Sequence, residues 1–231
     1  MKKIKLLLKF LVNVGLFVPS KLGIVRKEKD IESNGGKWHR QTKRHIELIK
    51  FINDADISLN AKILDVGCGK GWLINRLREN GFNNIQGCDW IEKIDNSEFE
   101  YTRLDLNSAG LRFYPDQTFD VVISSDVLEH MENPASILRE MARVLKPEGH
   151  IFITIPNCAN IYERLLFFLT GNSGRYRPQK NEWGHISYLP SHVIAELFNR
   201  ANLRLINAGG GGGYFFLWLF LGEYKASAAK L

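Results

Sequence analysis

Residues 62–71 read KILDVGCGKG, and this stretch predicts a strand, a tight turn and the start of a helix. The apolar run before the glycines is typical of a buried strand, and helical spacing of apolar residues begins directly after them. Between the two, Gly67, Gly69 and Gly71 let the backbone turn sharply and present N–H groups at the start of the helix. Asp65 precedes the first glycine by two positions, so the predicted loop also carries a carboxylate.

The rest of the chain alternates short apolar runs with amphipathic segments. One predicted helix starts at the capping residue Asn133, followed by Pro134, and stops at Pro147. Further strands are predicted at residues 84–88, 100–104, 119–124, 150–155, 203–207 and 214–221. This alternation predicts an α/β fold, a Rossmann-like doubly wound sheet of about seven mainly parallel strands with helices on both faces. Ligands of such sheets bind beyond the carboxyl ends of the strands, where the strand order reverses.

Acidic side chains stand at three successive predicted strand ends, Asp65, Asp89 and Asp105. A carboxylate beside a glycine loop repels a pyrophosphate but attracts a cationic amine. Asp89 stands about 20 residues after the loop, the spacing of the acid that binds ribose hydroxyls in nucleotide-binding sheets. Asp105 would accept from an adenine amino group, although an aspartate at a strand end also serves as a helix cap. S-adenosylmethionine (SAM) suits these charges, because it carries an ammonium and a sulfonium and has no phosphate.

Five motifs resemble those of class I SAM-dependent methyltransferases, particularly the small-molecule branch that includes ubiquinone-biosynthesis O-methyltransferases. They are ILDVGCGKG (63–71), GCD (87–89), LDL (104–106), FDVVISSDVLEHMENP (119–134) and LREMARVLKPEGHIFITIPN (138–157). The resemblance runs from about Lys62 to Asn157, and more loosely to Asn207. It implies a SAM site formed by Asp65, Gly67, Cys68, Gly69, Gly71, Asp89, Trp90, Asp105, Leu106 and Ser124. One departure is Glu148, which stands where the family often has glycine.

The same resemblance implies an enzyme that transfers a methyl group from SAM to a small-molecule acceptor, with oxygen as the expected acceptor atom. The basic N-terminal segment and the apolar run 214–220 favour a lipid-linked acceptor. Two alternatives stay open. A non-catalytic SAM-binding or scaffold protein would keep the glycine loop but lack a productive acceptor pocket. An NAD(P)-binding oxidoreductase is disfavoured, because its G-x-G-x-x-G fingerprint needs a glycine at position 72, where this chain has Trp72.

Two histidines, His130 and His185, are candidate general bases for the acceptor proton. His130 closes the sequence Asp126-x-x-Glu129-His130, and on a helix these three side chains would share a face. Some related quinone methyltransferases look like metal users at a comparable segment. The trio could hold Mg²⁺ or another divalent ion, but no metal is expected here, because hard divalent cations usually need more oxygen ligands. The alternative is that Glu129 and His130 bond to the backbone and orient the loop.

The chain is predicted to consist of a basic N-terminal segment with a linker, residues 1–36, and a methyltransferase domain, residues 37–231. Within that domain the aromatic-rich residues 158–190, which include His185, are predicted to form a lid over the acceptor. The first 50 residues hold 13 lysines and arginines against 4 acids, while the whole chain has a formal net charge of +6. The remainder of the chain is therefore mildly acidic.

Residues 1–20 have the pattern of a basic amphipathic helix, with Lys2, Lys5 and Lys9 on one side. Such a helix is predicted to lie on a membrane surface, and packing against the domain or another subunit is the alternative. No RNA-binding module accompanies these basic residues, so no nucleic-acid partner is predicted. The sequence carries no prediction of the oligomeric state.

The cysteines, Cys68, Cys88 and Cys158, include no C-x-x-C pair. Neither a disulfide framework nor a structural zinc site is therefore expected, and a reducing compartment fits. The predicted location is the cytoplasm, peripheral on the inner face of a membrane.

Overall fold

The computed structural model describes residues 43–92, 99–157, 160–172, 184–211 and 223–230. The predicted N-terminal segment 1–36 and the predicted strand 214–221 lie outside the described residues.

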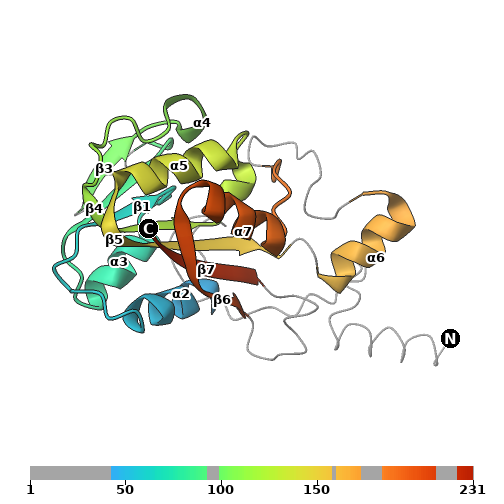
Figure 1. The fold of residues 1–231 in the computed structure, drawn as a ribbon, viewed down its shortest axis with the longest axis horizontal. Coiled ribbons are helices and arrows are strands. Elements are labelled where there is room, and N and C mark those ends of the chain that lie inside the picture. Colours follow the sequence, from blue (N-terminus) through green and yellow to red (C-terminus); the bar gives the residue numbers. More distant parts are fainter. Residues whose placement is uncertain (1–42, 93–98, 158–159, 173–183, 212–222, 231) are drawn as a thin grey trace.

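One sheet of seven strands forms the centre of the molecule, in the order β3-β2-β1-β4-β5-β7-β6 (Figure 1). The first five strands along the chain pair in parallel, whereas β7 runs antiparallel to both β5 and β6. The bounds are β1 Ile63–Val66, β2 Ile85–Asp89, β3 Glu100–Arg103, β4 Phe119–Ser125, β5 Leu145–Pro156, β6 Leu203–Gly211 and β7 Glu223–Lys230. The strand order reverses between β1 and β4, and this point places the candidate site.

Helices cover both faces of the sheet, which confirms the predicted fold class. The first face packs against α2 (Lys43–Asn53) and α3 (Trp72–Glu79), and the opposite face against α5 (Pro134–Val144) and α7 (Ser191–Arg200). Two shorter elements, α4 (Leu106–Ala109) and the 3₁₀ helix η2 (Leu128–His130), follow strand ends, and α6 (Ile161–Thr170) follows β5. Among the described residues, no helix has the length and apolar character needed to cross a bilayer.

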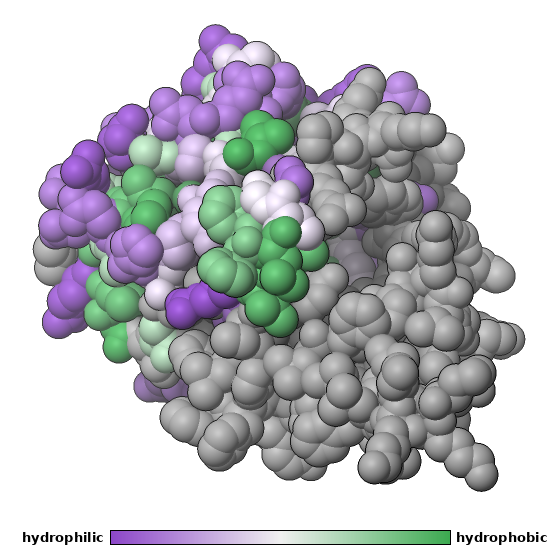
Figure 2. Space-filling view, turned by 90° about the vertical axis from the view of Figure 1, so that its right-hand side faces the viewer, coloured by the Kyte–Doolittle hydropathy of each residue, from purple (hydrophilic) through white to green (hydrophobic). Residues whose placement is uncertain are grey.

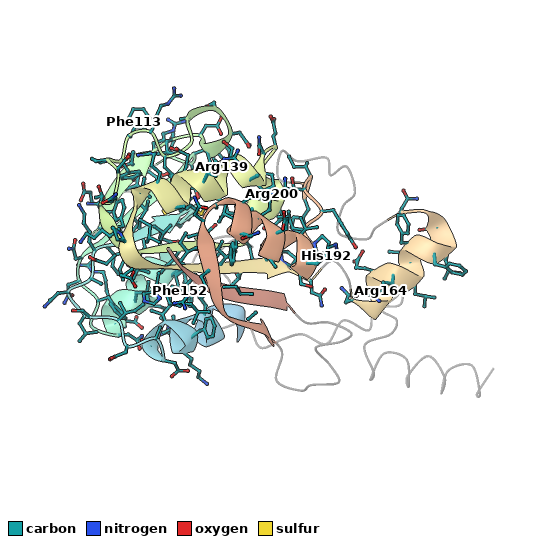
Figure 3. All side chains as sticks on the ribbon, viewed as in Figure 1. Phe113, Arg139, Phe152, Arg164, His192 and Arg200 are labelled. Carbon is teal, nitrogen blue, oxygen red and sulfur yellow. The ribbon has the colours of Figure 1, made fainter. Side chains whose placement is uncertain are left out.

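The two cores are separated by the alternation of side chains along each strand. On β4, Val122 points to the core under α5 and α7, while Val121 and Ile123 point to the core under α2 and α3. Phe152 of β5 joins the second core and meets Phe51 of α2 edge to face, with 6.0 Å between ring centroids (Figure 3). Strands buried on both faces read as continuous apolar runs, which is the signal that predicted β4.

The only departure noted in the family motifs, Glu148, lies where β5 loops out of register with β4. Phe119 pairs with Leu145 and Val121 with His150, so the intervening residues of β5 bulge out of the pairing with β4. Glu148 adopts φ 62°, in the left-handed region that glycine occupies without cost. The local backbone therefore explains why glycine suits this position.

Replacing Glu148 with glycine should stabilise the fold. The left-handed conformation costs a side-chain-bearing residue about 1–2 kcal/mol, which exceeds the added chain entropy of glycine in the unfolded state. We expect Glu148→Gly to raise the free energy of unfolding in urea by roughly 0.5–1 kcal/mol. As a control, Glu132→Gly at an exposed position with ordinary backbone angles should lower it; a loss of stability in both variants would contradict this account.

Candidate functional site

The glycine loop after β1 is folded as a left-handed turn against the end of β2. Gly67 and Gly69 have φ angles of 74° and 53°. The N–H groups of Gly67 and Cys68 both donate to the carbonyl of Cys88, at 2.8 and 3.1 Å. The side chain of Cys68 packs toward β2, because a Cβ added to Gly87 would lie 2.7 Å from its sulfur. Cys68 can therefore face a ligand only through its backbone.

Gly67 and Gly69 lack side chains for different reasons. A Cβ on Gly67 would lie 2.3 Å from Cγ2 of Val127, so the loop after β1 is in close contact with the segment after β4. A Cβ on Gly69 would meet no atom of the described residues within 4 Å. The space beside Gly69 is thus open to a ligand, as the predicted cofactor site requires.

Asp65 and Asp89 place two buried carboxylates around this loop, with exposed fractions of 2% and 8%. Within the described residues, Oδ2 of Asp65 has no hydrogen-bond partner. Burial, together with the negative charge of Asp89, raises the pKa of Asp65 from its usual 3.8 to about 7. A cationic group of a ligand would satisfy a buried acceptor of this kind.

Asp89 also shapes the loop that it faces. Its Oδ2 accepts from the N–H of Gly69 at 2.8 Å, and its Oδ1 accepts from the N–H of Ile91 at 3.2 Å. The hydroxyl of Tyr101 on β3 donates to the carbonyl of Asp89 at 3.0 Å and fixes the strand end. A carboxylate oxygen accepts more than one hydrogen bond, so both oxygens retain capacity for ligand hydroxyls. Tyr101 could not be identified from the sequence, because its contact arises only once β2 and β3 pair.

The remaining predicted cofactor residues lie at the same edge of the sheet. Trp90, next to Asp89, is 41% exposed, so a flat aromatic surface is available there. Oδ1 of Asp105 caps α4 by accepting from the N–H of Asn107 at 2.9 Å, and buried Leu106 begins that helix. The hydroxyl of Ser124 is buried without a hydrogen-bond partner in the described part of the chain. The capping role considered for Asp105 is thus present, and its second oxygen is not needed for it.

The two candidate bases lie side by side. Their imidazole rings meet edge to face with 4.8 Å between centroids, and Nε2 of His185 lies 3.9 Å from Oε1 of buried Glu129. The carbonyl of Glu129 accepts from the N–H groups of Ile186 and Ser187 at 2.9 and 3.0 Å. These bonds hold the segment around His185 against η2, which carries His130.

The surroundings of His130 determine both the position of its ring and its pKa. Its Nδ1 lies 3.2 Å from the carbonyl of Gly184, so an Nδ1-protonated ring would present Nε2 as an acceptor. Burial lowers its pKa, although the Gly184 carbonyl and the charge of Asp126 act in the opposite direction. The imidazole is therefore neutral near pH 7, as a general base requires.

Glu129 and His130 form a group with His185. The Asp126-x-x-Glu129-His130 pattern did not indicate this third member. The ligand atoms of these three residues lie within 4.8 Å of one another, a geometry that could also hold a cation. Asp126 instead faces β5, where Oγ1 of Thr154 donates to its Oδ1 at 3.3 Å. At the opposite edge of the sheet, a hollow lined by residues such as Asp56, Asp120 and His150 includes no predicted site residue.

The fold and the site define a class of protein. A doubly wound sheet with an open glycine loop and acidic strand ends is typical of Rossmann-like proteins that bind an adenosyl ligand without a pyrophosphate. The model of a family described as "Methyltransferase domain" matches residues 38–219. This chain therefore belongs to the methyltransferase domain family, and the resemblance noted in the sequence is confirmed.

Individual relatives agree with this assignment. A ubiquinone biosynthesis O-methyltransferase of Vibrio campbellii is 31% identical over 48% of this chain and 51% of its own length. One of Hydrogenovibrio crunogenus is 30% identical over 76% of this chain and 74% of its own length. The chain thus spans about half the length of the first of these curated relatives. A SAM-dependent methyltransferase structure from Mesorhizobium loti shares the fold, with a TM-score of 0.61, 16% identity and coverage of 82% of this chain and 99% of that one.

Alanine at Gly67 and at Gly69 should have different effects. Gly67→Ala should destabilise the fold by several kcal/mol, because its methyl group collides with Val127. Gly69→Ala should cost only about 1–2 kcal/mol, from its backbone angle alone, but should weaken SAM binding because the methyl group enters the ligand space. Thermal unfolding and SAM titration of both variants test this; equal SAM affinity of Gly69→Ala and the native protein would show that the ligand does not lie there.

The buried carboxyl of Asp65 should make the stability of the ligand-free protein depend on pH. With a folded pKa of about 7 and an unfolded value near 3.8, the folded state retains a proton that the unfolded state releases between these values. Relative to Asp65→Asn, the native protein should therefore lose up to about 4 kcal/mol of unfolding free energy as pH rises from 4 to 7. Urea unfolding at a series of pH values measures this difference.

The matched control is Asp56→Asn, which changes an exposed aspartate away from the loop. That variant should follow the native pH profile. An Asp65→Asn profile parallel to the native one would show that Asp65 carries no raised pKa.

Proposed function

We propose that this protein is a SAM-dependent methyltransferase (EC 2.1.1.-) that methylates a small-molecule acceptor at oxygen. The single observation that carries the proposal is the buried carboxylate of Asp65, which has an acceptor oxygen without a partner in the described residues beside an open glycine loop. Family membership and O-methyltransferase relatives support the same reading.

In this proposal the cofactor is held by the residues named from the sequence. Asp65 binds the ammonium group, Asp89 the ribose hydroxyls and Asp105 the adenine amino group, each through a carboxylate oxygen. Trp90 and Leu106 pack against the adenine. The backbone of the loop surrounds the rest of the ligand, and the buried hydroxyl of Ser124 offers a further polar contact. The backbone groups involved belong to Gly67, Cys68, Gly69 and Gly71.

When bound, SAM supplies a methyl group already activated on a sulfonium. The protein then has to align the acceptor oxygen with that methyl group and remove its proton. His130 is proposed as the base, with Nδ1 donating to the Gly184 carbonyl and Nε2 accepting the proton. His185, close to Glu129, is the second candidate, because a neighbouring carboxylate stabilises the imidazolium that forms.

The acceptor is proposed to be a small molecule or a lipid-linked one. Residues 158–190 would form its lid, and residues 1–20 would bring the enzyme to the inner face of a membrane, with the protein otherwise cytoplasmic. The Glu129–His130–His185 group is assigned to proton transfer, and a divalent metal is not required for it.

The proposal predicts distinct effects on catalysis and binding. With a phenol and a prenylated phenol as acceptors, His130→Asn should lower kcat by about 10²–10⁴-fold, because the general base is lost. SAM affinity should stay unchanged, since His130 does not contact the cofactor in this assignment. The native rate should fall with decreasing pH only below pH 6.5, because burial lowers the pKa of His130.

Transfer of a labelled methyl group from SAM measures both quantities, with His192→Asn, on the exposed N-terminal turn of α7, as control. Full turnover of His130→Asn would reassign the base, and His185→Asn then identifies the alternative. SAM binding without turnover on any acceptor would favour a non-catalytic SAM-binding protein.

A further inference from the structure

Helix α6 exposes an unusual amount of apolar surface. From its middle to its C-terminal end it carries Leu165, Phe167, Phe168 and Leu169, with exposed fractions of 46%, 61%, 84% and 68%. The helix extends away from the sheet beyond α7 (Figure 1), and a cluster of hydrophobic residues occupies the centre of the face viewed from that side (Figure 2). Large exposed apolar patches of this kind mark an interaction surface.

The helix is well formed at both ends. Buried Asn160 caps it by accepting from the N–H of Glu163 at 3.0 Å, and Glu163 is itself 4% exposed. At the other end Gly171 has φ 68° and donates to the carbonyl of Phe167 at 2.8 Å. The first turn therefore carries buried polar side chains, whereas the apolar side chains of the following turns are exposed on a helix with a defined end.

The direction of the apolar side chains favours lipid over a protein groove. At about 100° per residue, the four exposed side chains of α6 spread over roughly 200° of the helix circumference. A helix that docks in a protein groove presents a narrower stripe, whose members are spaced three or four residues apart. Apolar groups on most sides of a helix end suit a medium that surrounds it, such as the acyl region of a bilayer surface.

The distribution of basic residues in the sequence indicates the kind of bilayer to which α6 would bind. The first 27 residues contain seven lysines and arginines and no acid. The ten residues that directly follow α6, 171–180, contain Arg175, Arg177 and Lys180 and no acid. Arg164 on α6 itself is exposed (Figure 3). Clusters of basic residues beside an apolar element are the sequence pattern of binding to anionic lipids.

We propose that the end of α6 inserts into the surface of an anionic bilayer, with the exposed Arg164 of the same helix at the headgroups. Since α6 follows β5, at the edge of the sheet that carries the glycine loop, insertion would bring this edge close to the membrane. The inference deepens the proposed function by stating where a lipid-linked acceptor would enter, and it rests on that function only for this purpose.

Vesicle sedimentation of the full chain tests the proposal. The native protein should bind vesicles of phosphatidylcholine with phosphatidylglycerol more tightly than pure phosphatidylcholine. The double variant Phe167→Ser/Phe168→Ser should reduce binding to the anionic vesicles about tenfold or more, because two phenyl rings no longer enter the bilayer. The matched control is Phe113→Ser, which removes a phenylalanine 67% exposed elsewhere on the surface and should bind like the native protein.

Undiminished binding of the double variant would overturn the proposal, as would a native protein that binds neither vesicle. A change from dimer to monomer in the double variant, measured without lipid by light scattering, would instead assign α6 to contact between copies of the chain. New proteolysis within residues 1–20 of the double variant would show that this segment, and not a bilayer, covers α6.

SAM titration of the same variants separates this inference from the proposed function. The double variant should bind SAM like the native protein. Vesicle binding by a native protein that failed to bind SAM would leave the lipid contact standing and remove the proposed enzyme activity.

Discussion

The site depends on two carboxylates, Asp65 and Asp89, buried at the carboxyl ends of adjacent strands. The register pairs Asp65 of β1 with Gly87 of β2, so the negative charge of Asp89 lies close enough to raise the pKa of Asp65. Asp89 is stabilised by the N–H groups of Gly69 and Ile91. Asp65 has a raised pKa and an oxygen with no partner in the described residues. The ligand-free protein therefore bears an electrostatic cost that a cationic ligand would remove.

The rest of the fold has to offset this electrostatic cost and hold the two carboxylates in place. The parallel strands place the acids, the left-handed loop brings an N–H to Asp89, and Val127 fills the position that any side chain on Gly67 would need. Val127 thus packs the glycine loop against the segment that leads to His130. The candidate base pair is thereby fixed relative to the glycine loop through a chain of close contacts, as positioned chemistry requires.

Much of this arrangement could be predicted from the sequence, because the signals are local. Continuous apolar runs identified the buried strands, and the glycines with Asp65 identified the loop. The C-terminal part of the sheet was harder. The strand predicted at 214–221 lies outside the described residues, and the sequence patterns did not predict β7, Glu223–Lys230, a segment of alanines and charges with little strand signal. Its place between β5 and β6 is set by pairing, which a single segment does not reveal.

The candidate acceptor site was predictable only in part. His130 and His185 were each identifiable as bases, but their contact depends on the carbonyl of Glu129 accepting from residues 186 and 187, far away in sequence. The helical pattern suggested Asp126 as the third member of that group, but η2 begins only at Leu128, and the hydrogen bonds from Ile186 and Ser187 to Glu129 bring His185 there instead. The exposure of α6 could not be predicted either, because an apolar helical segment in a sequence is ordinarily assigned to the core.

Calorimetric titration of the native protein and Asp89→Ala with SAM, S-adenosylhomocysteine and NAD⁺ tests the central claim most directly. The account predicts binding of both adenosyl ligands by the native protein and none of NAD⁺. It also predicts a loss of about 1–3 kcal/mol of adenosyl binding free energy in Asp89→Ala, for a missing charged hydrogen-bond acceptor. Absence of adenosyl binding, or a preference for NAD⁺, would contradict the assignment of this edge of the sheet as a SAM site.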